Sequence, residues 1–260
     1  MMYKLYQVDA FTDQLFKGNP AAVVPLETWL ADDTMQAIAA ENNLAETAYF
    51  IPTTDGYHLR WFTPGIEVDL CGHATLATAH VLFEHLDYEE QQIVFHTRSG
   101  PLYVIRSENG YRMDFPADFS EVIAPPEALV RALGEIPLEV RKGKDDYLAI
   151  FPEEATVRDL QPDFRVLTQL DGRGVIASAP GNEVDFVSRC FFPNAGIDED
   201  PVTGSAHTVM TPYWAGKLNK TTLQARQISA RGGNLLCTLD GQRVLLEGRA
   251  VTYLEGTFKI

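Results

Sequence analysis

The sequence predicts an α+β protein of two related halves, each a curved sheet that wraps around one apolar helix. Three observations predict this fold. Short runs of alternating or apolar residues, typical of strands, recur along the chain. Residues 70–83 carry no charged side chain when the histidines are neutral, which predicts a helix that is buried on most sides. Segments of the first half also reappear in the second half, and 260 residues suffice for two domains of roughly 120–130 residues each.

The internal repeat consists of three matched segments that keep their order and nearly the same offset. Residues 60–64 match 189–193, residues 67–75 match 199–207, and residues 95–102 match 228–235. Gly72 and Gly204 occupy equivalent places, each at the start of a predicted helix. A helix start led by glycine leaves free backbone N–H groups open to an anion. We therefore expect the two starts to face each other across a cleft between the halves that binds an anionic ligand.

In the first half, Asp32 and Asp33 predict a helix start, and Met35, Ile38 and Ala39 form its apolar stripe. A turn at residues 18–20 precedes an apolar strand. The strands that we expect in this half lie at residues 3–11, 21–24, 45–51, 92–96, 102–106 and 111–115, with a further one that enters the central stretch at residue 60.

In the second half, we expect helices at 127–133, 162–170 and 207–218, and strands at 147–151, 175–179 and 183–192. Several antiparallel strands then fill the chain to residue 260. Pro125 and Pro126 indicate a linker near residues 121–126. The predicted domains are therefore residues 1–120 and 126–260, with the alternative that the last strand completes the N-terminal half.

The composition excludes several classes of protein. The net charge is −15 and the chain has no sizeable cluster of Lys and Arg, so we expect no nucleic-acid partner and no anionic membrane surface. No signal peptide and no membrane-spanning segment are predicted. Three cysteines without a CxxC spacing indicate reduced thiols in a cytoplasmic protein. We expect no cofactor and no metal, because neither a nucleotide-binding motif nor a metal-ligand spacing of histidines is present.

Glu46 is the first candidate for chemistry. If residues 45–51 form a strand, Glu46 shares a face with Ala48 and Phe50. A carboxylate on an apolar face is desolvated, which suits it to proton transfer near neutral pH. The alternative is a structural glutamate at the strand start that tilts toward solvent.

Two further candidates have structural alternatives. His73 follows Gly72 at the first helix start, beside the expected anion site, but a single histidine is often structural. Asp200 lies just before the second helix start, where it could cap the helix, bind a ligand group, or do both.

The motifs GNPAAVV, LAETAYF, RWFTPGIEVDLCGHATLA, GIDEDPVTGSAH with PYW, and ISARGG resemble those of the phenazine-biosynthesis PhzF-like isomerase family. The likeness extends from about residue 8 to residue 233. It implies the fold of diaminopimelate epimerase, with two pseudo-symmetric halves, a homodimer, and catalysis without a cofactor.

The resemblance also implies roles for individual residues. It makes Glu46, His73, Asp200 and Ser205 the catalytic residues, with Glu46 as the group that shuttles a proton. It assigns substrate binding to backbone groups around the two helix starts and to a glycine pair, at Gly72, Ala74, Gly204, Ala206, Gly232 and Gly233.

The cysteines separate this chain from related enzymes that use a pair of thiols. Cys71 occupies one thiol position of such a pair, but its counterpart in the repeat is Thr203. We therefore predict that Cys71 is a small buried residue without an acid–base role, and that Cys190 and Cys237 are also structural.

These observations predict a cofactor-independent isomerase that shifts a proton within a small, anionic carboxylic acid, cyclic or bearing an amino or hydroxyl group. Two alternatives stay open. One is an epimerase or racemase of a small amino acid that uses carboxylates in place of thiols. The other is a ligand-binding member of the same fold without turnover.

Overall fold

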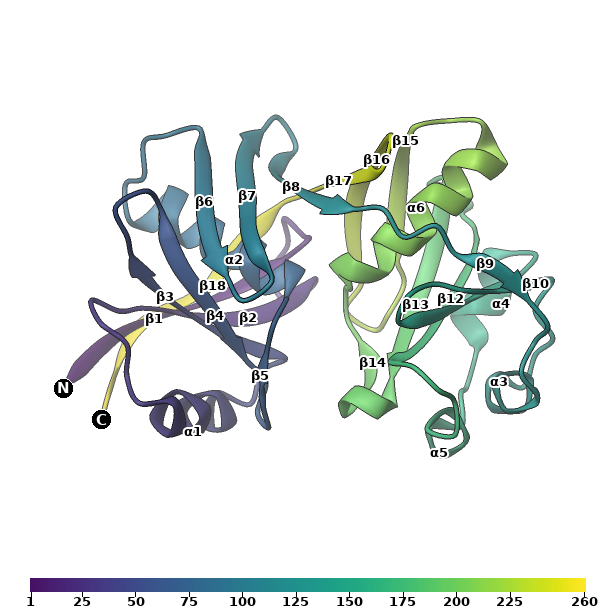
Figure 1. Ribbon diagram of the computed structural model, residues 1–260, viewed down its shortest axis with the longest axis horizontal. Coiled ribbons are helices and arrows are strands. Elements are labelled where there is room, and N and C mark those ends of the chain that lie inside the picture. The colour runs from purple at the N-terminus through teal and green to yellow at the C-terminus, as the bar shows by residue number, and fades with distance from the viewer. The chain divides into compact units, whose positions relative to one another are not determined.

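The computed structural model describes residues 1–260, which form two compact units (Figure 1). Unit 1 comprises Met1–Asp114 and Glu247–Ile260, and unit 2 comprises Phe115–Leu246. The division therefore falls at Asp114 rather than at 121–126, which lies inside unit 2, and the last strand belongs to unit 1. No helix of the chain combines the length and the apolar character that crossing a bilayer requires.

Unit 1 contains helices α1 (Asp32–Asn42) and α2 (Gly72–His85). Its strands are β1 (Met2–Ala10), β2 (Asn19–Pro25), β3 (Glu46–Pro52), β4 (Tyr57–Phe62), β5 (Glu67–Val68), β6 (Gln92–Thr97), β7 (Gly100–Ser107), β8 (Gly110–Pro116) and β18 (Ala250–Lys259). Strand β1 pairs with β18 and β2, β2 runs parallel to β3, and β3 is antiparallel to β4. Strand β4 then runs parallel to β6, which is antiparallel to β7.

Unit 2 contains helices α3 (Glu127–Leu133), α4 (Glu154–Asp159), α5 (Phe164–Leu167) and α6 (Gly204–Leu218), and the 3₁₀ helix η1 (Pro193–Ala195). Its strands are β9 (Glu121–Ile123), β10 (Glu139–Lys142), β11 (Asp146–Ile150), β12 (Gly174–Pro180), β13 (Phe186–Phe192), β14 (Ile197–Asp200), β15 (Thr222–Gln227), β16 (Gly233–Asp240) and β17 (Arg243–Gly248). The chain enters this unit within β8 and leaves it within β17.

The two units repeat one order of strand pairing. In unit 2, β10 is antiparallel to β11, β11 runs parallel to β12, and β12 is antiparallel to β13. Strand β13 runs parallel to β15, which is antiparallel to β16. This is the succession from β1 to β7 in unit 1, with α6 in the place of α2. The internal sequence repeat is therefore a repeat of topology.

An ion pair recurs at the same place in both units. Arg60 on β4 donates to both carboxylate oxygens of Glu67 at 2.7 and 2.8 Å. Arg189 on β13 donates to both oxygens of Glu199 at 2.8 Å. Such two-bond pairs fix the orientation of the two side chains. Each one ties a central strand to the segment that leads into the long helix.

Helix α2 forms the centre of unit 1. Residues 73–83 are all buried, which confirms the helix that the uncharged stretch predicted. The helix contacts β1, β2, β3 and β18, and Figure 1 shows the strands around it. Thr75 and Thr78 can be buried because their hydroxyls donate to the carbonyls one turn back, at 2.6 and 2.7 Å.

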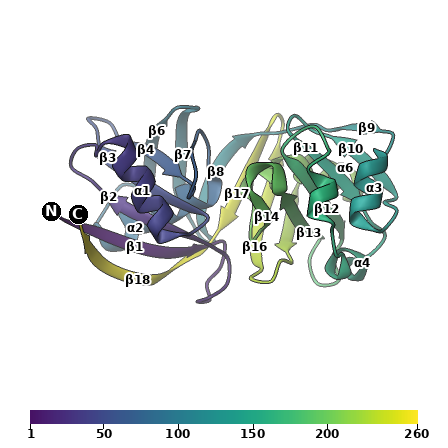
Figure 2. The ribbon, with the colours of Figure 1, turned by 90° about the horizontal axis from the view of Figure 1, so that it is seen from below.

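Helix α1 covers the opposite face of the strands (Figure 2). Met35, Ile38 and Ala39, the predicted stripe, pack in one apolar cluster with Tyr49 of β3 and Phe62 of β4. Because neighbouring residues of a strand point to opposite faces, even-numbered β3 residues point away from α1 and toward α2. Glu46 is one of them. The predicted face of the strand is therefore confirmed.

Helix α6 is the central helix of unit 2 and contains Pro212. A proline inside a helix leaves the carbonyl four residues earlier without its usual donor. Here that carbonyl, of Thr208, accepts from the backbone N–H of Asp118 at 3.0 Å. The helix therefore continues to Leu218 without an unsatisfied group at this point.

The short elements of unit 2 depart from the expected ones. The helix predicted at 162–170 is α5, one turn at Phe164–Leu167 whose start is capped by the Asp163 carboxylate. The strand predicted at 183–192 begins at Phe186, because residues 181–185 form a turn. Helix α4 and strands β9 and β10 were not predicted, because three to six residues carry too little periodicity.

His207 on α6 makes the stability of unit 2 depend on pH. Its Nδ1–H donates to the Thr203 carbonyl at 2.7 Å, while its Nε2 is buried without a hydrogen bond. Burial lowers the pKa of His207 from 6.5 to about 4, against the effect of the Thr203 carbonyl, because a proton added at Nε2 would find no partner.

We expect the free energy of unfolding to fall as the pH decreases from 6.5 to about 4. In that window the unfolded chain binds a proton at this position and the folded chain does not, and the loss approaches about 3 kcal/mol. Urea titrations across the window test this. The comparison variant is His207→Thr, which removes the imidazole and introduces the side chain of Thr75, the residue at the equivalent position of the repeat. A variant whose stability depends on pH as steeply as that of the wild type would contradict the assignment.

Candidate functional site

The site in unit 1 forms where β2, β3 and α2 meet. Glu46 is the first residue of β3 and pairs in register with Ala21 of β2. Gly72 begins α2, and its N-cap, Cys71, makes no side-chain capping hydrogen bond. The predicted site residues Glu46 and His73 are thereby brought together from two elements, both nearly buried, at 8% and 5% exposed.

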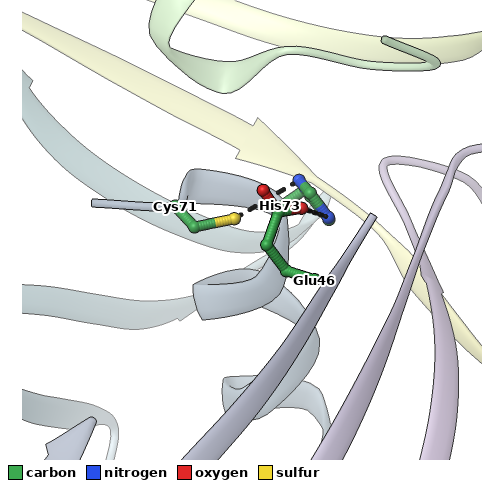
Figure 3. Close-up of side chains that lie close together, drawn as sticks. All are labelled: Glu46, Cys71 and His73. Carbon is green, nitrogen blue, oxygen red and sulfur yellow. Dashed lines mark hydrogen bonds and ion pairs between the residues drawn. The ribbon is translucent and has the colours of Figure 1, made fainter. Parts of the chain in front are cut away.

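Glu46 and His73 form the central contact of this site (Figure 3). The Glu46 Oε2 and His73 Nε2 atoms lie 3.1 Å apart, within ion-pair distance. Both atoms are buried, and the pair lacks the alignment of a hydrogen bond. A carboxylate held against an imidazole in this way is set for exchange of a proton.

The other ring nitrogen of His73 contacts two more side chains. Its Nδ1 lies 3.5 Å from the Cys71 sulfur and 3.2 Å from the Asn19 amide nitrogen. Asn19 is the first residue of β2 and was not predicted as a site residue. The available signal was a buried polar residue within the quoted GNPAAVV motif, at the start of an otherwise apolar strand.

The charges in this group are coupled. Burial by itself lowers the pKa of His73, but Cys71 and the Glu46 carboxylate oppose it and hold the pKa well above its usual value. Burial raises the pKa of the Cys71 thiol, and the Glu46 carboxylate adds to the rise, against the effects of His73 and the Ala74 N–H. These shifts favour the charged form of the imidazole and the neutral form of the thiol.

Gly18 determines where Asn19 lies. It has a φ of +66°, and a Cβ there would lie 2.2 Å from the Ala10 carbonyl oxygen and 2.6 Å from Thr12 Cγ2. A side chain at this position would therefore have to displace backbone. Asn19, and with it the contact to His73, depends on the absence of that side chain.

We expect Gly18→Ala to destabilise the protein by more than Gly134→Ala does. Gly134 has a φ of +72° with open space around it, so its substitution measures the cost of the left-handed conformation alone, about 1–2 kcal/mol. Overpacking should add at least about 1 kcal/mol at Gly18. Urea denaturation of both variants provides the comparison. Equal losses would show that the close approach at Gly18 carries no cost.

In unit 2, Asp200 ends β14 and is buried. The Thr203 hydroxyl donates to the Asp200 carboxylate. Gln227 is fully buried and was not predicted: its Nε2 donates to the Asp200 carbonyl at 2.6 Å, and its Oε1 accepts from the Thr203 N–H at 2.9 Å. The helix-capping role considered for Asp200 is corrected, because the N-cap of α6 is Thr203.

The predicted glycine pair lies beside Asp200. Gly232 donates its backbone N–H to the Ser229 hydroxyl at 3.0 Å, and that hydroxyl donates to the Pro201 carbonyl at 2.7 Å. Gly233 begins β16 and pairs with Gln227. The loop before β16 is therefore tied to the turn that follows Asp200.

The remaining predicted residues lie in the first turns of the two long helices. Ser205 is half-buried on α6, one residue after Gly204. Ala74 and Ala206 are completely buried, so their methyl groups belong to the cores and only their backbone groups could serve a ligand. No side-chain hydrogen bond caps either helix.

Comparison with known proteins identifies the family of this chain. A family model described as phenazine biosynthesis-like protein matches residues 8–256. The chain is 52% identical to a Pseudomonas aeruginosa protein named as an uncharacterized isomerase, with 100% of both chains covered. It is 48% identical to a protein of the phenazine biosynthesis PhzF family from Enterococcus faecalis, whose crystal structure matches with a TM-score of 0.97 over 100% of both chains.

A more distant structure shows the breadth of the fold. A hydroxyproline epimerase from Agrobacterium vitis matches with a TM-score of 0.63 at 12% identity, over 98% of this chain and 92% of that one. At this identity only the fold is shared. The predicted fold class, α+β with two related halves of the diaminopimelate epimerase type, is confirmed.

Proposed function

The chain belongs to the phenazine biosynthesis-like family, and from this premise we propose that it is an isomerase that moves a proton within a small carboxylic acid without a cofactor. The observation that carries the proposal is the contact of 3.1 Å between the Glu46 carboxylate and the His73 imidazole. It places a proton acceptor and a positively charged group together at the start of a buried helix. Neither group is needed there for capping.

Glu46 acts in this mechanism as general base and then as general acid. It removes a proton from one carbon of the substrate and returns it to another. A single carboxylate suffices because both carbons of a 1,3-shift can lie on the same face of the substrate. His73 stabilises the negative charge that develops between the two steps.

The substrate carboxylate is bound in this proposal by the backbone N–H groups at the start of α2, around Gly72 and Ala74. Helix starts favour anions because their N–H groups and the helix dipole point at the ligand. The protonated His73 adds a full positive charge at the same place. We expect an uncharged analogue, such as the amide of the acid, to bind more weakly.

The proposal also assigns residues of unit 2 to substrate binding. Asp200 and Ser205 orient a substrate, and backbone groups of Gly204, Ala206, Gly232 and Gly233 bind it. This part rests on the internal repeat and on the family resemblance. A homodimer and a cytoplasmic location are predictions of the same kind.

A screen of candidate substrates in D₂O tests the proposal. Unsaturated cyclic acids that bear an amino or hydroxyl group are incubated with the protein and followed by NMR and ultraviolet absorbance. We expect a double bond to move and a proton to be relocated or exchanged for deuterium at one carbon. Loss of optical rotation without an absorbance change would establish an epimerase instead. Saturable binding without exchange for every ligand that binds would establish a binding protein.

We expect Cys71→Ala to retain turnover within about tenfold of the wild type. Its counterpart in the repeat, Thr203, has a hydroxyl in place of a thiol, so these two positions cannot form a pair of thiols, and that hydroxyl donates to Asp200. The ratio kcat/KM of the variant, compared with that of Cys237→Ala, measures the effect. A loss of several orders of magnitude with an unchanged circular dichroism spectrum would make Cys71 an acid–base group and favour the epimerase.

A further inference from the structure

The proposed mechanism makes no use of Cys71, yet this thiol lies in a group of three metal-binding side chains. One ligand atom each from Glu46, Cys71 and His73 lies within 4.8 Å of the other two. Figure 3 shows the sulfur and the carboxylate both directed at the imidazole ring. The group is drawn from two separate elements, β3 and the start of α2, so sequence adjacency does not account for it.

The polar atoms of this group are incompletely satisfied. Glu46 Oε2 is buried and has no hydrogen-bond partner. Glu46 and His73 are both more than nine-tenths buried. Buried polar atoms without partners are rare in folded proteins and favour binding of a group that satisfies them.

The distance between the Cys71 sulfur and His73 Nδ1 suits tetrahedral coordination of a metal ion. Zinc bonds of about 2.3 Å to sulfur and about 2.05 Å to nitrogen place these two atoms about 3.6 Å apart at a tetrahedral angle. Cys71 Sγ and His73 Nδ1 lie 3.5 Å apart. The ligand atom of Glu46 lies within 4.8 Å of the other two, so a rotation of its side chain would bring the carboxylate in as a third ligand.

The chemical types of the three ligands determine which metal ion is favoured. A thiolate, an imidazole and a carboxylate together favour Zn²⁺ or Co²⁺. Mg²⁺ and Ca²⁺ prefer sites built from oxygen atoms alone. The formal charge of two negative ligands and one neutral ligand also matches a divalent cation once the thiol and the imidazolium have each released a proton to solvent.

We propose that Glu46, Cys71 and His73 form a Zn²⁺ site, and that Zn²⁺ bound there inhibits the protein by occupying Glu46. The inhibition rests on the proposed function, because it requires Glu46 to be the base. The binding of the metal does not. The site would make activity respond to free zinc with no change of fold.

Metal binding is measured first, on the full chain freed of metal by a chelator and kept reduced. Addition of Co²⁺ should produce the near-ultraviolet charge-transfer absorption of a cobalt–thiolate bond, and Zn²⁺ should abolish it by displacement. Cys71→Ala should lose this absorption. Glu46→Gln should weaken binding by more than the roughly 10–100-fold that loss of an outer-shell partner costs.

Two controls separate this site from others. Cys237→Ala removes another fully buried thiol, on β16, and should keep the absorption. His96→Gln removes a surface imidazole that contacts Asp55 at 3.0 Å and neighbours His58. Metal bound at His96 would have no thiolate ligand and would give no thiolate band. His96→Gln should therefore keep the absorption.

The outcomes are distinct for binding and for function. Absence of a thiolate band in the wild type, or its persistence in Cys71→Ala, overturns the metal site. With a substrate in hand, Zn²⁺ should reduce wild-type turnover in proportion to occupancy of the site. Turnover that rises with Zn²⁺ would overturn both the inhibition and the cofactor-independent mechanism. A thiolate band in a protein that turns over no substrate would support the metal site and refute the proposed function.

Discussion

Glu46→Gln is expected to bind substrate nearly as well as the wild type and to turn it over roughly 10²–10⁴-fold more slowly, the usual contribution of a general acid–base group. The amide keeps the shape of the carboxylate and its reach to His73 at 3.1 Å, but it cannot accept the substrate proton. The loss should be larger if this one group performs both proton transfers. Steady-state kinetics with the substrate found in the D₂O screen measure kcat and KM separately.

The matched control is Glu41→Gln, the same change at an exposed position of α1. It should leave both constants unchanged. A second variant, Glu46→Asp, keeps an ionisable group but shortens its reach and should fall between the wild type and Glu46→Gln. Wild-type turnover by Glu46→Gln would show that this residue is structural and that the proposed mechanism is wrong.

Leu76→Ala is expected to lower the free energy of unfolding by about 3–5 kcal/mol, the cost of a large-to-small change in a core that cannot collapse around it. Leu76 is completely buried on α2, and residues 73–83 of that helix are buried on every side. The strands around the helix hold one another in register, so little relaxation is available. Urea denaturation followed by circular dichroism measures the change.

Leu86→Ala is the control for this substitution. Leu86 is the C-cap of the same helix and is 40% exposed, so its truncation should cost less than about 1 kcal/mol. A similar loss for both variants would mean that α2 is not the centre of the unit 1 core. If Leu76→Ala lowered the free energy of unfolding only slightly and also reduced the slope of that free energy against urea concentration, the substitution would have changed the denatured state instead.

Features that depend on neighbouring residues were predictable from the sequence. The helix over Asp32–Asn42 ends at Asn43, whose φ of 50° is a left-handed conformation that asparagine tolerates. The helix over Glu127–Leu133 ends at Gly134 for the same kind of reason. The internal repeat was also visible, because matched residues preserved one topology twice. For the two helices the periodicity and the end signals lie within a few residues of each other.

The individual site residues could be named, but their contacts could not. Glu46 and His73 are separated by the whole of β4 and β5 and meet only because β3 and α2 pack together. Asn19 and Gln227 escaped prediction because their partners, His73 and the segment 200–203, lie far away along the chain. A polar residue in an apolar strand has many explanations until its partner is known.

Cys71 shows most clearly what tertiary structure added. From its counterpart Thr203 the sequence predicted that no pair of thiols forms, and it described Cys71 as small and buried, which it is. Only the fold places its sulfur 3.5 Å from His73 Nδ1 and in one cluster with Glu46. Local pattern determines which segments become helices and strands, because their hydrogen bonds and burial periodicity are local. The chemistry of a buried group depends on charges and dipoles within a few ångströms, and packing across the sheet decides which those are.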